Sequence, residues 1–352
     1  MSQHSGVNPL RHRPAQDRLS RHAIHDPCQR TGRVVTYTNG QNFRICKEIT
    51  LQILRKGMNR QAHMKLHQIY HPITAAPFRC APDYMEFAPC DALKPYIRCF
   101  WGSLKPVVQE ESTVSQIDIV TPDTCMDIIF TADFANNTID NAFCAMDERA
   151  FVTRQTGRTK KTFFRFAIRF YAWGASLFAA ESMKNTKNAC FDTAYHFPAI
   201  KKEIEKRLFD VENIRQLIPV AETLLLNHLR DNYQNPVIFQ SVSKILNTKG
   251  NLSMADLKQE ALVSSRQLER LFVEYIGVSP KSLAAMVRYQ YLWNGFLYHD
   301  SFNIADAAYQ YGYSDQAHLC HDFKKYHSMS LSDAKEFAMQ NVGNVQYNSF
   351  GS

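Results

Sequence analysis

Long polar side chains gather on two short stretches near the C-terminal end of the sequence. The first stretch offers Ser265, Arg266, Gln267, Glu269 and Arg270, and the second offers Gln316, His318, His321, Lys324 and Lys325. Arginine can donate two hydrogen bonds to a guanine edge, glutamine can pair with adenine, and lysine can neutralise a phosphate. These residue types therefore favour contacts with double-stranded DNA, provided that each stretch presents them together on one face.

The two stretches are copies of one pattern, offset by 51 residues. Five positions fall into register: Ala261 with Gly312, Leu268 with Leu319, Phe272 with Phe323, Tyr275 with Tyr326, and Ser279 with Ser330. Three positions differ in kind: Arg270, Gly277 and Pro280 are replaced by His321, Ser328 and Leu331. The repeat predicts one supersecondary unit that is used twice.

In the first copy, Ser253 and Asp256 have the spacing of a capping box, so a short helix is expected to begin after Ser253. A turn at Leu262-Val263 leads to Ser264, a second helix cap, and the apolar residues that follow have helical spacing. Leu268, Leu271 and Phe272 are expected to face inward. A helix, a tight turn and a helix with an outward polar face form a helix-turn-helix, whose second helix fits a major groove about 12 Å wide.

The second copy repeats this arrangement with its own cap residues. Asn303 can cap a helix over 304–311, Gly312 allows the turn, and Asp315 can cap the next helix. Leu319 and Phe323 are expected to point inward. The run between the units, 282–299, is about 27 Å long as a helix. It can therefore hold the two units near the roughly 34 Å that separates successive major grooves.

Three histidines in the second copy invite a metal alternative, because His318 and His321 lie one helical turn apart and His327 follows. No cysteine, aspartate or glutamate completes a tetrahedral set at a familiar spacing. We therefore expect neither a metal ion nor a cofactor. A histidine in place of arginine at position 321 instead predicts a weaker and pH-sensitive DNA contact.

The positive charge of the chain lies outside these units. Residues 1–65 hold 12 Lys and Arg against 3 Asp and Glu, a net of +9, whereas residues 66–352 hold 29 against 30. Residues 244–352 have a net charge of zero, with 10 residues of each sign. The segment 1–65 is expected to be a basic, disordered extension, and DNA binding would depend on local clusters of cations and on dimers.

Upstream, residues 66–230 have the pattern of a β-rich domain. Phe164, Phe166, Ile168 and Phe170 alternate with smaller or charged residues, which puts four large apolar groups on one face of a strand. Helical spacing follows over 198–229, where one stripe of residues either packs on its own domain or forms a dimer seam. The stripe consists of Ile214, Leu217, Ile218, Ala221, Leu224, Leu225 and His228. Turn formers over 231–236 then mark a boundary, so the fold class is α+β with an all-α C-terminal domain.

Several other classes of protein are not indicated. No apolar run approaches the roughly 20 residues that span a bilayer, which favours a cytoplasmic protein without a membrane partner. The nine cysteines are scattered and never form a C-x-x-C pair. None of the familiar hydrolase, nucleotide-binding or zinc-protease motifs is present, so we do not expect an enzyme.

Residues 236–338 resemble the DNA-binding domain of AraC-type bacterial transcription regulators. The resemblance rests on "LSMADLKQEALVSSRQLERLFVEYIGVSP" and on "NIADAAYQYGYSDQAHLCHDFKKY". It implies base contacts from Arg266, Glu269, Arg270, Gln316, His318 and His321. Where the family usually has Phe-Ser-Arg and Gly-x-Ser-Pro, the second unit has Leu-Cys-His and Ser-Met-Ser-Leu. Upstream, "PDTCMDIIF" and "FFRFAIRFYAWGASLF" look like an uncharacterised sensor-type domain that accompanies such regulators.

The resemblance implies promoter DNA, RNA polymerase, a second protomer and a small-molecule effector as partners. Two alternatives stay open. One is an AraC-like domain attached to a DNA repair alkyltransferase with a reactive cysteine, although Cys80 and Cys90 are ten residues apart and no four-cysteine cluster exists. The other is a regulator whose second helix-turn-helix has decayed into an interaction module.

Overall fold

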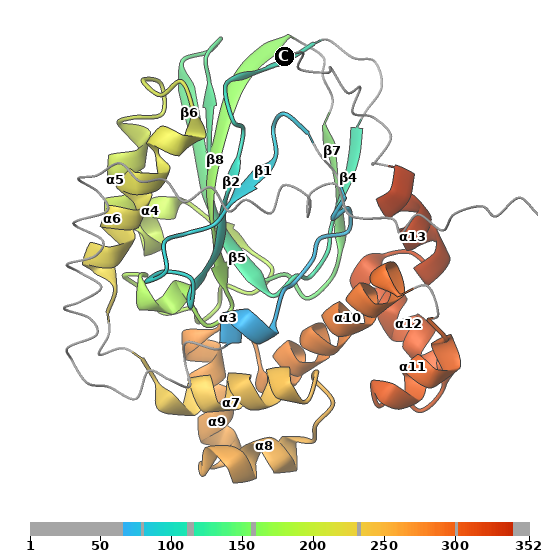
Figure 1. The fold of residues 1–352 in the computed structure, drawn as a ribbon. Helices are drawn as coiled ribbons and strands as arrows, with labels where there is room; N and C mark the ends of the chain where they lie inside the picture. The colour runs from blue at the N-terminus through green and yellow to red at the C-terminus, as the bar shows by residue number, and fades with distance from the viewer. Residues whose placement is uncertain are drawn as a thin grey trace, which may run out of the picture. The chain divides into compact units, whose positions relative to one another are not determined.

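The computed structural model describes residues 66–78, 81–110, 116–155, 160–230, 234–299 and 302–340. All of them belong to one compact unit, residues 34–352. The expected extension 1–65 and half of the expected boundary 231–236, residues 231–233, lie outside the described residues. Apart from the short helix α3 (Leu66–Ile69), strands come first and helices follow (Figure 1). The α+β fold class is confirmed.

The N-terminal part is built on an antiparallel sheet. Its strands are β1 (Met85–Phe87), β2 (Ile97–Gly102), β3 (Val107–Gln109), β5 (Cys125–Asp133), β6 (Thr138–Cys144), β8 (Lys161–Tyr171) and β9 (Cys190–Phe191). Their order is β1-β2-β8-β5-β6-β9, and β3 pairs with one end of β8. A separate two-stranded sheet joins β4 (Gln116–Val120) to β7 (Phe151–Gln155).

Strand β8 lies at the centre of the large sheet, between β2 and β5. The predicted alternation is confirmed, because Phe164, Phe166, Ile168 and Phe170 are all fully buried. On the other face, Ala167 packs with the buried Cys99 and Trp101 of β2. Burying each large apolar side chain contributes about 1.5–3 kcal/mol, so this central strand does much to hold the sheet together.

Helices α4 (Thr193–His196), α5 (Pro198–Glu205) and α6 (Ile218–His228) lie along one side of the sheet, with a 3₁₀ turn at Ile214–Gln216 (Figure 1). The predicted stripe is covered within the chain: Ile214, Leu217, Ile218, Ala221 and Leu225 are buried. The structure therefore favours packing on its own domain over a dimer seam. His228 is exposed, so its place in the stripe was wrong, and Leu226 is buried instead.

Every described element after α6 is a helix. They are α7 (Pro236–Asn247), α8 (Met254–Ala261), α9 (Ser265–Tyr275), α10 (Pro280–Tyr298), α11 (Ile304–Gln310), α12 (Gln316–His327) and α13 (Leu331–Gln340). The long helix α10 runs from the group α7–α9 to the group α11–α13 (Figure 1). It has 19 residues, close to the predicted spacer. None of the helices in the described ranges is long and apolar enough to cross a membrane.

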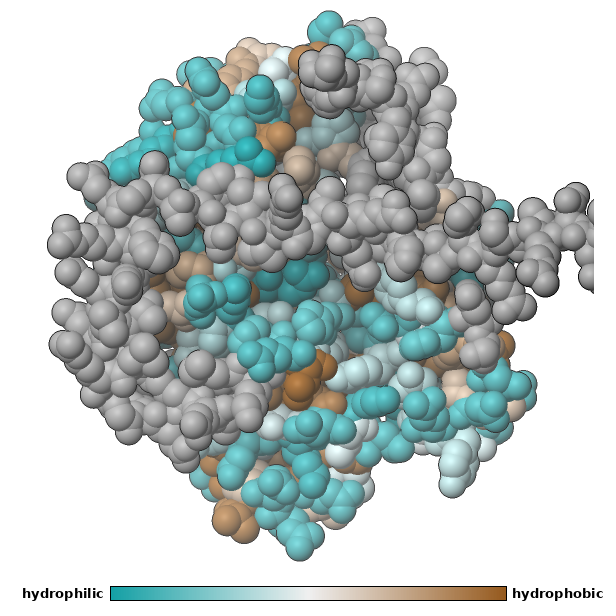
Figure 2. Space-filling view, viewed as in Figure 1, coloured by the Kyte–Doolittle hydropathy of each residue, from teal (hydrophilic) through white to brown (hydrophobic). Residues whose placement is uncertain are grey.

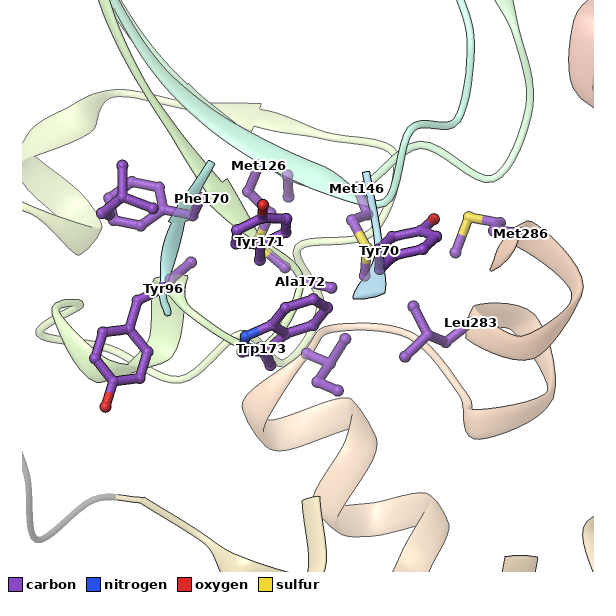
Figure 3. Packing of buried hydrophobic residues seen from close by; sticks show 14 of the residues in the cluster. Tyr70, Tyr96, Met126, Met146, Phe170, Tyr171, Ala172, Trp173, Leu283 and Met286 are labelled. Carbon is purple, nitrogen blue, oxygen red and sulfur yellow. The ribbon is translucent and has the colours of Figure 1, made fainter. Parts of the chain in front are cut away.

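The hydrophobic core is continuous between the sheet and α10. Tyr70, after α3, lies between Trp173 at the end of the sheet and Leu283 and Met286 of α10 (Figure 3). The ring centroids of Tyr70 and Trp173 are 6.5 Å apart. On the outside, the described surface in Figure 2 is mainly hydrophilic, and its hydrophobic patches are small and separate. Buried apolar side chains of α10 therefore pack against the N-terminal part of the same chain as well as against its neighbouring helices.

Candidate nucleic-acid interface

The first helix-turn-helix consists of α8 and α9. The predicted capping box begins α8: Ser253 Oγ accepts from Asp256 N at 3.1 Å, and Asp256 Oδ2 accepts from Ser253 N at 3.1 Å. Helix α8 ends at Leu262, whose φ of +53° is left-handed. Ser264 Oγ then accepts from Gln267 N at 3.2 Å and begins α9. The predicted caps and the predicted turn of this unit are confirmed.

Helix α9 separates its apolar and polar residues as predicted. Leu268 and Phe272 are fully buried and Leu271 is 8% exposed. The predicted DNA-facing side chains are all exposed: Ser265, Arg266, Gln267, Glu269 and Arg270. Because α9 begins at Ser265, these five residues occupy its first two turns. This is the part of a recognition helix that reaches base edges in a major groove.

The second unit, α11 and α12, is built in the same way. Asn303 Oδ1 accepts from Ala305 N at 2.7 Å, and Asp315 Oδ1 accepts from His318 N at 2.7 Å. Gly312 makes the turn with a φ of +71°. Leu319 and Phe323 are fully buried, as predicted. The predicted DNA-facing side chains are again all exposed: Gln316, His318, His321, Lys324 and Lys325.

Two of these exposed side chains already have partners in the second unit. Ser314 Oγ lies 3.1 Å from His318 Nδ1, and the ring of Tyr313 meets the His318 ring edge-on at 5.3 Å. The ammonium of Lys325 lies 3.3 Å from the hydroxyl of Tyr326 and 4.7 Å from its ring centroid. His318 is thus oriented by the turn through its Nδ1, and its side chain stays exposed.

After its second helix, the second unit keeps the backbone conformation and the helix cap of the first, although its residues there differ. Gly277 and Ser328 hold equivalent places, and both are left-handed, with φ values of +86° and +64°. Ser279 Oγ accepts from Ser282 N at 3.0 Å, and Ser330 Oγ accepts from Asp333 N at 3.2 Å. Serine caps therefore begin α10 and α13 alike, with or without a proline after them.

The third histidine of the metal alternative does not face the other two. His327, at the end of α12, is fully buried, whereas His318 and His321 are exposed. Within the described part of the chain, no group of three histidine, cysteine, aspartate or glutamate side chains is placed to hold a metal ion.

Several acidic side chains of these units are occupied within the protein. Hydrogen bonds from backbone N–H groups and from serine hydroxyls hold the pKa values of Asp256 and Asp315 below their usual range. Asp322 pairs with Arg288 of α10 at 3.4 Å, and the guanidinium of Arg288 lies 4.5 Å from the Tyr313 ring centroid. Sequence reasoning missed Arg288, since its partners come from another helix and a turn. Because these carboxylates are engaged within the protein, they neutralise the exposed lysines and arginines less than a net charge of zero suggests.

Two family models match the chain. A helix-turn-helix domain matches residues 257–336, and a domain of unknown function (DUF6597) matches residues 85–192. No curated protein matches the chain. Solved structures that are similar include an AraC-type transcriptional regulator from Chromobacterium violaceum, with 23% identity over 31% of this chain and 96% of that chain, at a TM-score of 0.28.

Two structures of ToxT from Vibrio cholerae are also similar. That of strain O395 has 14% identity over 70% of this chain and 99% of that chain, with a TM-score of 0.31. That of strain SCE256, with an unsaturated fatty acid bound, has 10% identity over 64% of this chain and 96% of that chain, with a TM-score of 0.32.

The matched helix-turn-helix domain covers both units and the helix that joins them, so the class is a DNA-binding transcription regulator. Its C-terminal part carries a helix-turn-helix domain similar to that of AraC-type regulators, and its N-terminal part matches a domain of unknown function. The resemblance predicted for its C-terminal part is confirmed. The N-terminal part matches a domain of unknown function, and neither family match indicates an alkyltransferase.

Proposed function

We propose that the chain binds promoter DNA in two successive major grooves. In this proposal α9 reads one groove with Arg266, Glu269 and Arg270, supported by Ser265 and Gln267. Helix α12 reads the next with Gln316, His318 and His321, while Lys324 and Lys325 contact phosphates. The exposure of all ten side chains on two equivalent, capped helices supports this assignment.

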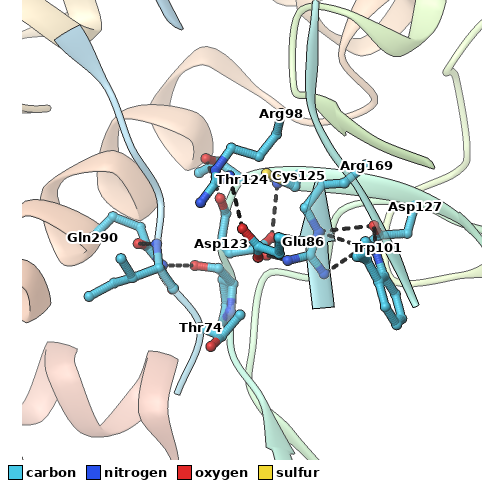
Figure 4. A network of polar contacts seen from close by, with 12 residues as sticks. Thr74, Glu86, Arg98, Trp101, Asp123, Thr124, Cys125, Asp127, Arg169 and Gln290 are labelled. Carbon is cyan, nitrogen blue, oxygen red and sulfur yellow. Dashed lines mark hydrogen bonds and ion pairs between the residues drawn. The ribbon is translucent and has the colours of Figure 1, made fainter. Parts of the chain in front are cut away.

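We further propose that residues 66–230 act as a sensor or dimerisation domain that controls binding by residues 236–338. The single observation that carries this is Gln290 of α10, which is 2% exposed. Its Nε2 donates to Ile73 O at 3.1 Å and to Pro122 O at 2.8 Å, and its Oε1 accepts from Ile73 N at 2.8 Å (Figure 4). The helix between the two DNA-reading units is thus held by the backbone of the N-terminal part.

The chain segment that Gln290 binds continues into a buried ionic network. Directly after Pro122, Asp123 Oδ2 lies 3.5 Å from Arg169 Nη1, and Arg169 also binds Asp127 of β5 (Figure 4). A second tie is Trp293 of α10, whose Nε1 donates to Thr74 O at 3.0 Å. A small-molecule effector or a second protomer that shifts the end of the sheet would therefore shift α10. Contact with RNA polymerase is proposed from the class alone.

The reading residues are tested by selecting DNA sequences with the full-length protein and by footprinting the preferred site. We expect protection of two successive major grooves. Arg270→Ala should relax the preference at one half of the site and His321→Ala at the other, each by about 1–3 kcal/mol per base pair. Lys202→Ala, on the exposed side of α5, is the control and should change nothing. Protection of one groove alone would instead support a decayed second unit.

The coupling is tested with Gln290→Leu, which removes the amide from a site far from either reading face. If the N-terminal part controls α10, this variant should bind the selected DNA with altered affinity while keeping the same sequence preference. A variant that folds and binds with unchanged affinity would contradict the coupling but not the DNA contacts.

A further inference from the structure

A loop of the N-terminal part, residues 181–189, reaches the first recognition helix. Met183 N donates to the carbonyl oxygen of Glu274 in α9 at 2.8 Å. Thr186 Oγ1 donates back to Met183 O at 2.7 Å, and both side chains are buried. The loop is therefore fixed to α9 by a backbone hydrogen bond and closed by an internal one.

The turn after α9 packs closely against this loop. Gly277 has a φ of +86°, and a Cβ built on it would lie 2.7 Å from Thr186 Oγ1 and 3.0 Å from Met183 O. Its counterpart in the second unit, Ser328, carries a side chain in the same left-handed conformation. At this position the first unit packs closely against the loop, which accounts for a glycine at 277.

The loop and the reading face of α9 line one cavity of about 510 Å³. Ser182 and Lys184 line it from the loop, and Arg266, Arg270 and Glu274 are among the residues that line it from α9. In α9 the inward residues Leu268 and Phe272 lie on the opposite side, so the cavity opens on the outward face. A DNA strand beside that face would therefore meet the loop as well as the helix.

Lys184 is the cation that the loop brings to this cavity. Its side chain is exposed, and in the described ranges no carboxylate lies within 4.0 Å of its ammonium. Lys184, Arg266 and Arg270 outnumber the two carboxylates of the cavity, those of Glu269 and Glu274. Phosphates flank a major groove on both sides, so a cation beside a helix in the groove is placed to neutralise one of them.

We propose that Lys184 contacts a backbone phosphate of the DNA that α9 reads, which extends the DNA interface into the N-terminal domain. This rests on the proposed placement of α9 in a major groove. Arg266 and Arg270 would distinguish bases, whereas Lys184 adds affinity that is independent of sequence. The opposite arrangement, in which the loop blocks α9, is an outcome of the same experiment.

The test compares full-length wild type, Lys184→Ala and the control Lys202→Ala on the selected duplex and on a scrambled duplex, over a series of KCl concentrations. We expect Lys184→Ala to weaken binding to both duplexes by the same factor, about 5- to 10-fold near 0.1 M salt, and to reduce the slope of log K against log salt by about 1. Lys202→Ala should match wild type.

The remaining outcomes overturn the inference. An unchanged salt slope would show that Lys184 touches no phosphate, and tighter binding by Lys184→Ala would show that the loop blocks the helix. If the wild type showed no preference for the selected duplex, the proposed base contacts would be wrong. Arg270→Ala tests those contacts separately from Lys184→Ala.

Discussion

The hydroxyl oxygen of Tyr289 and Nδ1 of His327 lie 2.7 Å apart, and both side chains are fully buried. The imidazole is stacked on Phe323, with ring centroids 4.9 Å apart, and meets the Trp293 ring edge-on at 4.5 Å. This hydrogen bond joins α10 to the end of α12, so it helps to place the second recognition helix. Burial lowers the pKa of His327 to about 3, and the imidazole is neutral in the folded protein.

The buried histidine predicts a loss of stability in mild acid. The unfolded chain binds a proton at His327 below about pH 6.5, whereas the folded protein does not until about pH 3. This stability is therefore fully present above pH 6.5, and falls with pH by about 1.4 kcal/mol per unit within that window. Urea unfolding of wild type and His327→Asn at pH 7.5 and 5.5 measures it. The wild type should lose about 1.4 kcal/mol more than the variant. Equal losses would contradict the neutral, buried imidazole.

The two left-handed positions after the recognition helices should respond in opposite ways to substitution. Gly277→Ala puts a methyl group against Thr186 and Met183 and strains a positive φ, so it should destabilise the protein by at least about 1–2 kcal/mol. Ser328→Gly relieves a left-handed residue and should be neutral or stabilising by up to about 1 kcal/mol. Thermal and urea unfolding measure both. Similar effects of the two substitutions would mean that the loop does not constrain Gly277.

Features that depend on nearby residues could be predicted from the sequence. Asn303 and Asp315 cap helices that begin one residue later, and Leu319 and Phe323 are inward because helical spacing sets their face. Gln290 gave no such signal, because its partners are 217 and 168 residues away in the sequence. His327 and His228 show what helical spacing cannot predict. The spacing indicates on which side of a helix a residue lies, but not whether another element packs against that side. His327, the last residue of α12, is buried against Tyr289 and Trp293 of α10, whereas His228, the last residue of α6, is exposed.

The N-cap of the second recognition helix should matter for both stability and DNA binding. Asp315 accepts a hydrogen bond from His318 N, and Asp315→Ala leaves that donor without a partner. We expect a loss of about 1 kcal/mol in the free energy of unfolding, within the 0.5–2 kcal/mol range of such caps. Fraying of the first turn would also move Gln316 and His318. Footprinting should then show weaker protection at the half-site of α12, while Asp315→Asn, which keeps an acceptor, should stay close to wild type.

The buried guanidinium of Arg169 should be the most sensitive polar group of the sheet. Its Nε donates to Asp127 Oδ1 at 2.9 Å and its Nη2 to Asp127 Oδ2 at 3.0 Å, a bidentate pair, and its side chain is only 12% exposed. Arg169→Met leaves the carboxylates of Asp127 and Asp123 buried beside an apolar chain, which should cost about 3–5 kcal/mol.

Lys160→Ala is the matched control for Arg169→Met, because its partner Glu110 is 69% exposed and such surface pairs contribute about 0–1 kcal/mol. Urea unfolding of both variants measures the difference. If Arg169→Met folds, the altered end of β5 should also weaken the hold of Pro122 on Gln290, and the affinity for the selected DNA should change with it. A loss below about 1 kcal/mol would show that the network is replaceable by apolar packing.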